Sequence, residues 1–179
     1  MILQTERLFL RKWRQEDFAD LAEMLQDPQV MYAYEHDFSD ADVQAWMERQ
    51  WQRYQENGFG LWAVVEKQSG EIVGQAGLTI QQCEGQDILE IGYHLKRKHW
   101  KKGYAAEAAK GCMQYAFEVL NAPAVYSVIK SDNLASQKVA ERMGMKKQKE
   151  FWATYYAGPM LHFLYSRENP NKQTEEAKK

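Results

Sequence analysis

The sequence predicts a single domain of the mixed α/β (α+β) class, with one central mixed sheet flanked by helices. Three observations predict it. The chain has 179 residues, which suits one medium-sized domain, and 45% of them are hydrophobic, enough for a substantial core. Segments of alternating and of helical hydrophobic spacing follow each other in the order β-α-α-β-β-β-α-β-α-β-β. Hairpins among the early strands and crossover helices later imply both antiparallel and parallel neighbours.

The first strand and the two helices after it are predicted by the spacing of their apolar residues. The segment TERLFLRKW alternates Leu8 and Leu10 with polar neighbours, as a strand does. RQEDFADLAEMLQDP has helical spacing and stops at its aspartate–proline pair. In SDADVQAWMERQWQRYQENG, Ser39 or Asp40 provides the N-cap, the apolar residues form one stripe, and Gly58 ends the helix.

The rest of the chain is predicted to add a hairpin, a third strand and an alternation of helices and strands. FGLWAVVEK and IVGQAGLTIQ form the hairpin over the turn QSGE, and DILEIGYHL follows. YAAEAAKGCMQYAFEVL is a helix with a narrow small-residue face. AVYSVI is a strand, DNLASQKVAERMG a short helix closed by Gly144, and MKKQKEF and MLHFLYS the last strands. We expect one domain over residues 1–168 and a polar, disordered tail over residues 169–179.

Composition and charge restrict the function. The net charge is −2 and the pI about 6.1, whereas domains that bind nucleic acid carry a basic excess, so any bound anion should be small. Neither Cys83 and Cys112 nor the histidines show metal-ligand spacing, so no metal is expected. Two unpaired thiols suit a reducing compartment. Because no signal peptide is present and no apolar run reaches the roughly 20 residues of a membrane span, we expect a cytoplasmic protein without a membrane partner.

A cluster of cations lies between the predicted strand at residues 87–95 and the predicted helix that begins at Tyr104. Lys96 to Lys102 contains five positive side chains and is followed by Gly103. Free N–H groups at a helix N-terminus bind phosphate, and a glycine lets the backbone approach a ligand. The pattern indicates a site for a phosphorylated small molecule, with Arg97, Lys98, Lys101 and Lys102 adding positive potential. The alternatives are a solvated turn and a nucleic-acid site.

The stretch RKHWKKGYAAEA resembles the acyl-CoA-binding loop of GCN5-related N-acetyltransferases (GNAT), in particular the RimJ/RimL-like branch, which reads close to W-G-K-G-Y-A-T-E-A. EIGYHL before it, DNLASQKVAERMGM after it and TERLFLRKW at the start are similar to the same branch, so the resemblance covers about residues 3–166. Here Lys101 replaces the usual glycine, so the loop must adopt a φ that lysine tolerates.

The resemblance implies a central, splayed, mostly antiparallel sheet, in which two parallel strands part and admit the pantetheine arm of acetyl-CoA, the co-substrate. These strands would be residues 88–95 and 124–129. By the same resemblance, pantetheine would bind the backbone of Tyr93, His94 and Leu95 and the side chain of Asn133. The pyrophosphate would bind the backbone N–H groups of Lys101, Lys102, Gly103, Tyr104, Ala105 and Ala106.

The expected chemistry is direct attack of a primary amine on the thioester in a ternary complex, which requires a base and a donor for the oxyanion. Glu90 is the preferred base, because a carboxylate in an otherwise apolar strand is costly unless it is paired or used. A structural role for Glu90 remains open, and Glu107 is the rival carboxylate. An N–H near Leu95 would bind the acetyl oxygen. The position of the family's acidic tyrosine is Ala140, which leaves Ser136 or water to protonate the thiolate.

The acceptor is expected to be a protein N-terminus or a small-molecule amine. Tyr32 and Tyr34 fall in a segment that borders the acceptor cleft in the family, and Glu35 and His36 would attract a cationic amine. A different class of function, a CoA-binding sensor or regulatory module without catalysis, is an alternative because the tyrosine is missing. The sequence leaves the identity of the acceptor and a homodimer open.

Overall fold

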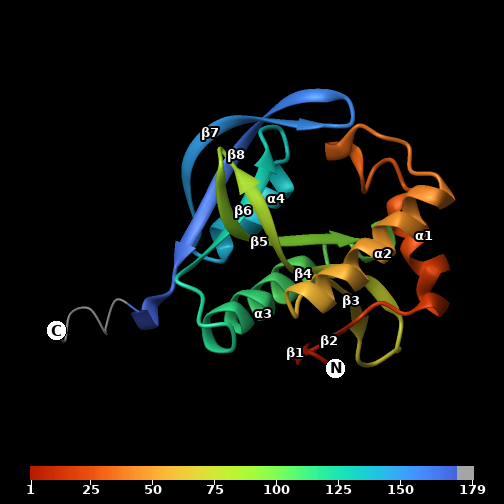
Figure 1. Cartoon of the computed structure of the whole chain (residues 1–179). Helices are drawn as coiled ribbons and strands as arrows, with labels where there is room; N and C mark the ends of the chain where they lie inside the picture. Colours follow the sequence, from red (N-terminus) through yellow and green to blue (C-terminus); the bar gives the residue numbers. More distant parts are fainter. Residues whose placement is uncertain (173–179) are drawn as a thin grey trace.

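The computed structural model describes residues 1–172 and contains one eight-stranded sheet, in the order β1-β2-β3-β4-β5-β6-β8-β7 (Figure 1). The strands are β1 (Leu3–Gln4), β2 (Leu8–Arg11), β3 (Leu61–Glu66), β4 (Ile72–Cys83), β5 (Gln86–Leu95), β6 (Ala124–Lys130), β7 (Lys146–Tyr155) and β8 (Gly158–Glu168). The helices are α1 (Phe18–Leu25), α2 (Asp40–Glu56), α3 (Tyr104–Glu118) and α4 (Leu134–Arg142), and the 3₁₀ turns are η1 (Gln15–Asp17), η2 (Tyr32–Tyr34) and η3 (Arg97–His99).

The predicted mixed α/β sheet and its order of elements are confirmed, with the short β1 added before the first predicted strand. All neighbouring strands pair antiparallel except β5 and β6, which pair parallel. The helix α3 separates β5 from β6 in the chain, as a parallel connection requires. The chain passes through α4 between β6 and β7, so β7 need not pair with β6. In the sheet β8 lies next to β6, and β7 forms the outer strand of the last hairpin.

Both faces of the sheet are covered by helices. In β3, Trp62 and Val64 belong to the core under α3, whereas Leu61, Ala63 and Val65 pack with α1 and α2. This alternation explains why the strand is hydrophobic at every position, as strands with two buried faces are. The small-residue face of α3 lies on the sheet as predicted, with the fully buried residues Ala108, Ala109, Cys112 and Ala116.

The strands β5 and β6 part almost as soon as they meet. Their ladder consists of one register pair, Glu90 with Tyr126. In a continuous ladder the next backbone groups would bond to each other across the strands. Instead, the N–H of Val128 donates to Oε1 of Glu90 at 3.1 Å, and Oγ of Ser127 donates to the carbonyl of Ile91 at 3.2 Å. These two side chains satisfy the backbone where the opening begins.

The domain extends slightly beyond the predicted boundary at residue 168. Asn169 is 1% exposed, and its side-chain amide donates to the carbonyls of Phe117 (3.4 Å) and Ala122 (2.9 Å). Asn169 therefore holds the end of β8 to the segment after α3, and its assignment to a disordered tail was wrong. Residues 173–179 of the predicted tail lie outside the described residues.

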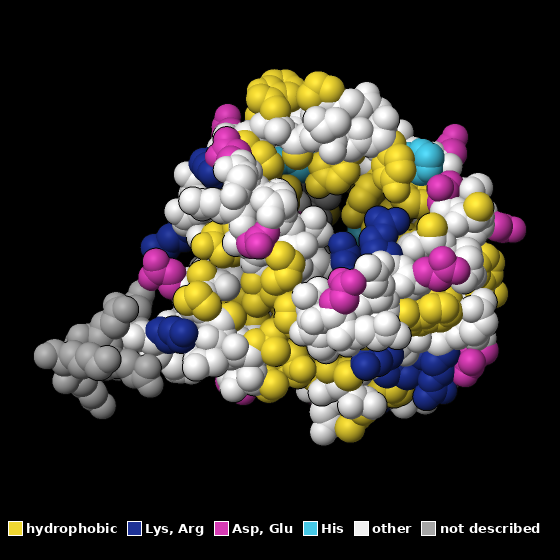
Figure 2. Space-filling model, in the orientation of Figure 1, with side chains coloured by type: hydrophobic (Ala, Val, Ile, Leu, Met, Phe, Trp, Pro, Cys, Tyr) yellow, Lys and Arg dark blue, Asp and Glu magenta, His cyan; other side chains and the backbone are white. Residues whose placement is uncertain are grey.

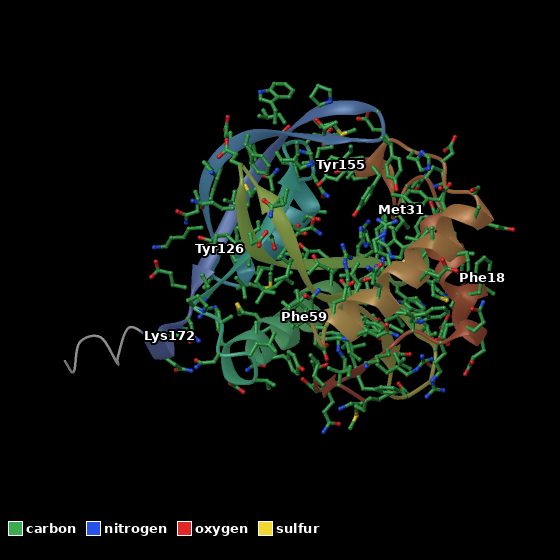
Figure 3. The ribbon with its side chains drawn as sticks, viewed as in Figure 1. Phe18, Met31, Phe59, Tyr126, Tyr155 and Lys172 are labelled. Carbon is green, nitrogen blue, oxygen red and sulfur yellow. The ribbon has the colours of Figure 1, made fainter. Side chains whose placement is uncertain are left out.

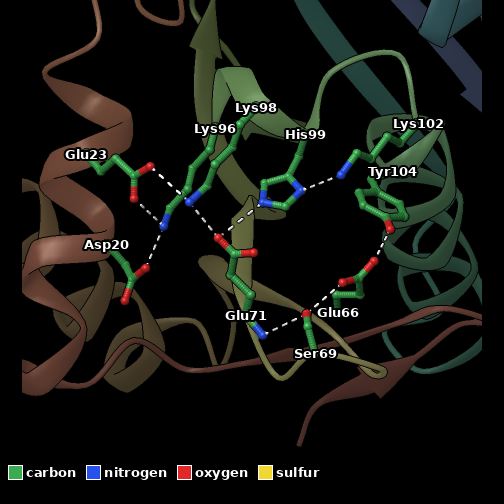
Figure 4. Close-up of polar contacts among 10 residues, drawn as sticks. All are labelled: Asp20, Glu23, Glu66, Ser69, Glu71, Lys96, Lys98, His99, Lys102 and Tyr104. Atoms are coloured by element: carbon green, nitrogen blue, oxygen red, sulfur yellow. Dashed lines mark hydrogen bonds and ion pairs between the residues drawn. The ribbon is translucent and has the colours of Figure 1, made fainter.

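Part of the basic cluster supports the fold. Lys96 is 2% exposed, and its ammonium lies 2.5 Å from Asp20 and 2.7 Å from Glu23, both on α1 (Figure 4). Lys98 pairs with Glu23 and with Glu71, the residue before β4. These contacts join α1 and the turn before β4 to the end of β5. A buried ammonium depends on its carboxylates, because an unpaired charge in the interior is costly.

We expect substitution of the carboxylates Asp20 and Glu23 to destabilise the protein more than substitution of their partner Lys96. The double change Asp20→Asn and Glu23→Gln leaves the ammonium buried without a counter-charge and should lower the free energy of unfolding by ~3–5 kcal/mol. Lys96→Met leaves two carboxylates that are 39% and 48% exposed, and should cost less than about 2 kcal/mol. Urea unfolding measures both, with the exposed Lys98→Met as control. A larger loss for Lys96→Met than for the double variant would contradict this account.

Candidate active site

A cavity of about 670 Å³ occupies the opening between β5 and β6. It runs from the N-terminus of α3, past α4, to η2, α2 and the end of the β7–β8 hairpin. Figure 2 shows this face hollowed at its centre, with hydrophobic side chains around the hollow and Lys or Arg side chains at its edge. Most of the sequence-predicted site residues line it, namely Tyr32, Tyr34, Glu90, Tyr93, His94, Leu95, Lys101, Gly103, Tyr104, Ala105, Ala106, Asn133 and Ser136.

The loop before α3 adopts the left-handed conformation twice. Gly103 is the N-cap of α3 with φ 82°, and Lys101 has φ 63°. A non-glycine residue such as Lys101 can adopt this left-handed conformation, at a cost of ~1–2 kcal/mol. Because a helix gives its first N–H groups no intrahelical acceptor, Tyr104, Ala105 and Ala106 present free amides at this end of the cavity. These amides and the positive end of the helix dipole form an anion site.

The cations contribute less to this anion site than the sequence predicted. Arg97 pairs with Asp27 at 3.1 Å, and Lys98 pairs with carboxylates as described above. The ammonium of Lys102 lies 3.3 Å from Nδ1 of His99 (Figure 4). The backbone carbonyl of Lys102 accepts a hydrogen bond from the Arg7 side chain at 3.0 Å. Of the five cations, Lys101 is the one that lines the cavity. The prediction of a shared positive potential was therefore wrong for Arg97 and Lys98.

The edge of β5 that faces the opening can be deduced from its pairing with β4. The N–H of Lys96 donates to the carbonyl of Val73 at 3.0 Å. Since backbone groups of successive strand residues point to alternate sides, those of His94 also face β4, and those of Tyr93 and Leu95 face the opening. The expected contact of the His94 backbone with pantetheine is therefore wrong, and His94 brings its side chain to the cavity instead.

Glu90 lies where β5 and β6 part, with a half-buried side chain that lines the cavity. Burial raises the pKa of its carboxyl to about 7, against the opposing effects of the Val128 N–H, the Arg53 charge and the Thr79 hydroxyl. Thr79 is the cross-strand neighbour of Glu90 on β4. The Glu90 carboxyl is thus bound by groups of β4 and β6, and with a pKa near neutrality it can exchange a proton at physiological pH.

The tautomer of His94 follows from its neighbours. The indole N–H of Trp46 can only donate, and it donates to Oε1 of Gln75 at 3.2 Å. The Gln75 amide nitrogen therefore faces Nδ1 of His94, 3.0 Å away, and Nδ1 must accept. The proton of the neutral ring is then on Nε2. Because burial lowers the pKa of His94 to about 4, the ring stays neutral at pH 7.

Asn133 and Ser136 lie at the start of α4. Asn133 is the N-cap, and its Oδ1 accepts from the Ser136 N–H at 3.1 Å, which leaves its NH₂ group available to a ligand. The carbonyl of Ser136 accepts from the Tyr93 hydroxyl at 3.1 Å. Ala140, at the position of the family's acidic tyrosine, is fully buried in the core. Two residues with hydroxyl groups line the cavity here, Ser136 on α4 and Tyr93, which bonds to it.

Glu107, the rival carboxylate, is a structural residue. Its carboxylate accepts hydrogen bonds from the Thr5 hydroxyl at 2.6 Å and from the Arg7 backbone N–H and side chain at 2.8 and 2.7 Å. These bonds hold the turn between β1 and β2 against the first turn of α3. The carboxylate has no free face, so Glu107 is not a candidate base.

The acceptor end of the cavity is bounded by aromatic rings from distant segments. The Tyr34 ring contacts Tyr155 (centroids 5.7 Å apart) and Trp46 (5.9 Å), and the His36 ring stacks on Tyr156 at 4.0 Å. In Figure 3, Met31 and Tyr155 mark the η2 side and the hairpin side of this aromatic bridge. The bridge joins the segment after α1 to the β7–β8 hairpin across the opening.

Glu35 and His36 do not attract an amine in the way that the sequence predicted. The Glu35 carboxylate pairs with the Lys130 ammonium at 2.7 Å, and Nε2 of His36 lies 3.3 Å from the Asp42 carboxylate. The His36 ring belongs to the aromatic bridge and the Glu35 carboxylate to an ion pair with the end of β6, and neither residue lines the cavity. Charged residues in a loop do not indicate which oppositely charged residues the fold will bring beside them, so the pairing with Lys130 and Asp42 could not be predicted from the sequence.

Two arginines that the sequence analysis did not select line the same end of the cavity. Arg49 and Arg53 are one turn apart on α2, on the side of the helix that also carries Trp46 and Gln50. Gln50 is fully buried and bonds the Leu61 N–H. The signal in the sequence was the polar Gln50 within the apolar stripe of this helix, which indicates that this face contacts polar groups as well as the hydrophobic core.

Comparison with known proteins agrees with this geometry. The profile of the Acetyltransferase (GNAT) domain matches residues 7–146. The chain belongs to the GNAT acetyltransferase family. The family uses acetyl-CoA as co-substrate, and the cavity fits that role with helix amides at one end and, beside them, the edge of β5 that no longer pairs with β6. The chain is therefore an enzyme of the acyltransferase class.

The curated relatives share most of the chain. An uncharacterised protein of Bacillus subtilis (strain 168), YkkB, is 38% identical over 150 residues, which cover 82% of this chain and 86% of that protein. An uncharacterised N-acetyltransferase of Bacillus licheniformis, p20, is 32% identical over 149 residues, covering 82% and 83%. A ribosomal-protein-S5-alanine acetyltransferase from Vibrio fischeri has the same fold, with a TM-score of 0.74 at 20% identity over 94% and 96% of the two chains.

Within residues 1–172, no helix is both long and apolar enough to cross a membrane. The same residues contain no group of three or more His, Cys, Asp or Glu side chains arranged to hold a metal ion.

Glu90 should make stability depend on pH. Its pKa of about 7 lies above the ordinary value of 4.5, so the folded state binds more protons than the unfolded chain between these values. The stability it contributes is present at low pH and is lost as pH rises toward 7. Glu90→Gln removes this loss, so the variant should gain about 1–3 kcal/mol relative to wild type between pH 4.5 and 8.

Urea unfolding of both proteins across this range measures the difference. The control is Glu107→Gln. Burial acts to raise the pKa of Glu107, but the hydrogen bonds from Thr5 and Arg7 outweigh it and lower that pKa. The wild type should therefore be more stable than Glu107→Gln at neutral pH and should lose this advantage in stability as pH falls. A stability difference between wild type and Glu90→Gln that stays constant with pH would contradict the assignment.

Proposed function

We propose that this enzyme transfers an acetyl group from acetyl-CoA to a primary amine, by direct attack while both substrates are bound. The observation that carries the proposal is the position of Glu90. Its carboxyl, with a pKa of about 7, lies in the same cavity as the free amides of α3 and the open edge of β5. A base, a phosphate site and a channel between strands are the parts that the reaction needs.

The residues around the cavity suggest how acetyl-CoA is held. The backbone groups of Tyr93 and Leu95 would pair with the pantetheine arm, and the NH₂ group of Asn133 would donate to it. The amides from Gly103 to Ala106 would bind the pyrophosphate, with Lys101 beside them. Acetyl-CoA, when bound, supplies the thioester carbonyl that the amine attacks.

Proton transfer is assigned to Glu90. Its ionised form takes the proton of the attacking amine, while the Val128 N–H and the Thr79 hydroxyl keep the carboxylate in place. A backbone N–H near Leu95, on the open edge of β5, is the proposed donor to the acetyl oxygen. Ser136 or water would protonate the departing thiolate. Since a CoA thiolate is a fair leaving group, this last role contributes least.

Glu90→Gln should separate chemistry from binding. Glutamine keeps an oxygen for the Val128 N–H but cannot take a proton, so kcat/KM should fall ~10²–10⁴-fold while acetyl-CoA affinity is unchanged. The wild-type rate should rise through pH 7, and this step should be missing in the variant. Thiol release with an amine panel and calorimetry measure the two quantities. Equal pH profiles would remove Glu90 from the mechanism.

The loop before α3 offers a second test. Gly103→Ala places a side chain at φ 82° and should turn the neighbouring amides, raising the Kd for acetyl-CoA about tenfold. Gly85→Ala is a matched control, because Gly85 has φ 81° in the turn between β4 and β5, away from the cavity. Both variants should lose ~1–2 kcal/mol of stability. An unchanged Kd for Gly103→Ala would place the phosphates elsewhere.

The alternative of a CoA sensor without catalysis is decided by the same assays. Tight acetyl-CoA binding without thiol release in the presence of any amine would favour it. The proposal places the enzyme in the RimJ/RimL-like branch, with support from the loop sequence and from the fold shared with the S5-alanine acetyltransferase. We also propose a cytoplasmic enzyme, since Cys83 and Cys112 are buried free thiols, as a reducing compartment favours.

A further inference from the structure

The acceptor end of the cavity carries two arginines without a carboxylate partner. Arg49 and Arg53 both line it, and none of the ion pairs within residues 1–172 includes either of them. Arg53 is half-buried, and its guanidinium donates to the neutral Oε1 of Gln50 at 3.3 Å. Arg49 lies over the Trp46 ring at 5.6 Å. Arg49 is exposed and Arg53 is the half-buried member of the pair, so an anion that reaches both would offset their mutual repulsion where Arg53 is removed from water.

The electrostatics around Arg53 support this interpretation. Burial lowers the pKa of Arg53, and the charge of Arg49 lowers it further, while Glu90 acts in the opposite direction. Arg53, Glu90 and Tyr34 therefore lie close enough to influence one another at one end of the cavity. Among the described residues that line the cavity, Glu90 is the one carboxylate. That end pairs a single proton acceptor with two cations.

Contacts between distant segments border the same end. The aromatic bridge of Tyr34 with Tyr155 and of His36 with Tyr156 joins the segment after α1 to the β7–β8 hairpin, and the Glu35–Lys130 ion pair joins it to the end of β6. A cavity of about 670 Å³ must also hold the pantetheine arm. The volume left beside that arm favours a small acceptor over a polypeptide.

We propose that Arg49 and Arg53 bind a carboxylate of the acceptor, so that the substrate is a small amino acid-like molecule with its amine at Glu90. This inference rests on the proposed function and names its substrate class. A guanidinium matches a carboxylate with two parallel hydrogen bonds, and such a pair strengthens where water is excluded. The positive wall disfavours polyamines, because a second ammonium would meet the arginines.

The test uses matched acceptors and matched variants of the full-length protein. Free amino acids and ω-amino acids are compared with their carboxamides, with spermidine and with N-terminal peptides, by thiol release from acetyl-CoA. The carboxamides keep the amine and remove only the anion. We expect the acids to react with a kcat/KM at least tenfold above their carboxamides.

Arg53→Gln and Arg49→Gln should each raise KM for the acid about 10–100-fold, leaving the Kd for acetyl-CoA unchanged. Arg53→Lys should be intermediate, because it keeps the charge and loses the paired donors. Arg14→Gln, which changes an exposed arginine paired with Glu16, controls for net charge and should leave KM unchanged. Calorimetry of the acids with the CoA-bound protein reports binding even when turnover is slow.

The outcomes separate this inference from the proposed function. Acetyl-CoA binding and thiol release with spermidine, a peptide or a carboxamide in preference to the acids would overturn the carboxylate site and keep the acetyltransferase. Unchanged KM in both arginine variants would do the same. Failure to bind acetyl-CoA would overturn both. A preference for acids that disappears in Arg53→Gln would establish the inference.

Discussion

The structure depends on one interruption in its sheet, the loss of backbone pairing between β5 and β6 after a single register pair. Unpaired backbone groups in a protein interior are costly, so the opening exists only because something else satisfies them. At the start of the opening Glu90 binds the Val128 N–H and Ser127 binds the Ile91 carbonyl. Farther along, the edge of β5 is left for a ligand. The cavity, the anion site and the base all follow from this point.

The position of Glu90 gives its carboxyl both its structural contacts and its raised pKa, for the same physical reason. The carboxylate is placed by the backbone of β6 and by Thr79, and the burial that this position imposes raises its pKa to about 7. A group exposed at a strand edge would keep its ordinary pKa and would be a weaker base at neutral pH. The opening therefore positions the carboxyl that we propose as the base and raises its pKa at the same time.

The charges of the molecule are divided between scaffold and site. The run from Lys96 to Lys102 is used mainly to tie α1 and the turn before β4 to the end of β5, and Lys101 alone of that run lines the cavity. The cations of the acceptor end come instead from α2, more than forty residues earlier in the chain. A phosphate site built on helix amides needs few side-chain charges, which leaves the cationic loop free for structural pairing.

The sequence by itself determined the order of elements and the small-residue face of α3, and it indicated the loop at Gly103 and Glu90 as candidate site residues, because these depend on local spacing and on motifs within one segment. Only the tertiary structure decided that Glu35 pairs with Lys130, that the His94 backbone faces β4, and that Arg49 and Arg53 line the same cavity as Glu90. Each of these depends on which distant segments the sheet brings together. Side-chain periodicity shows which face of an element is buried, but it does not show what that face will contact.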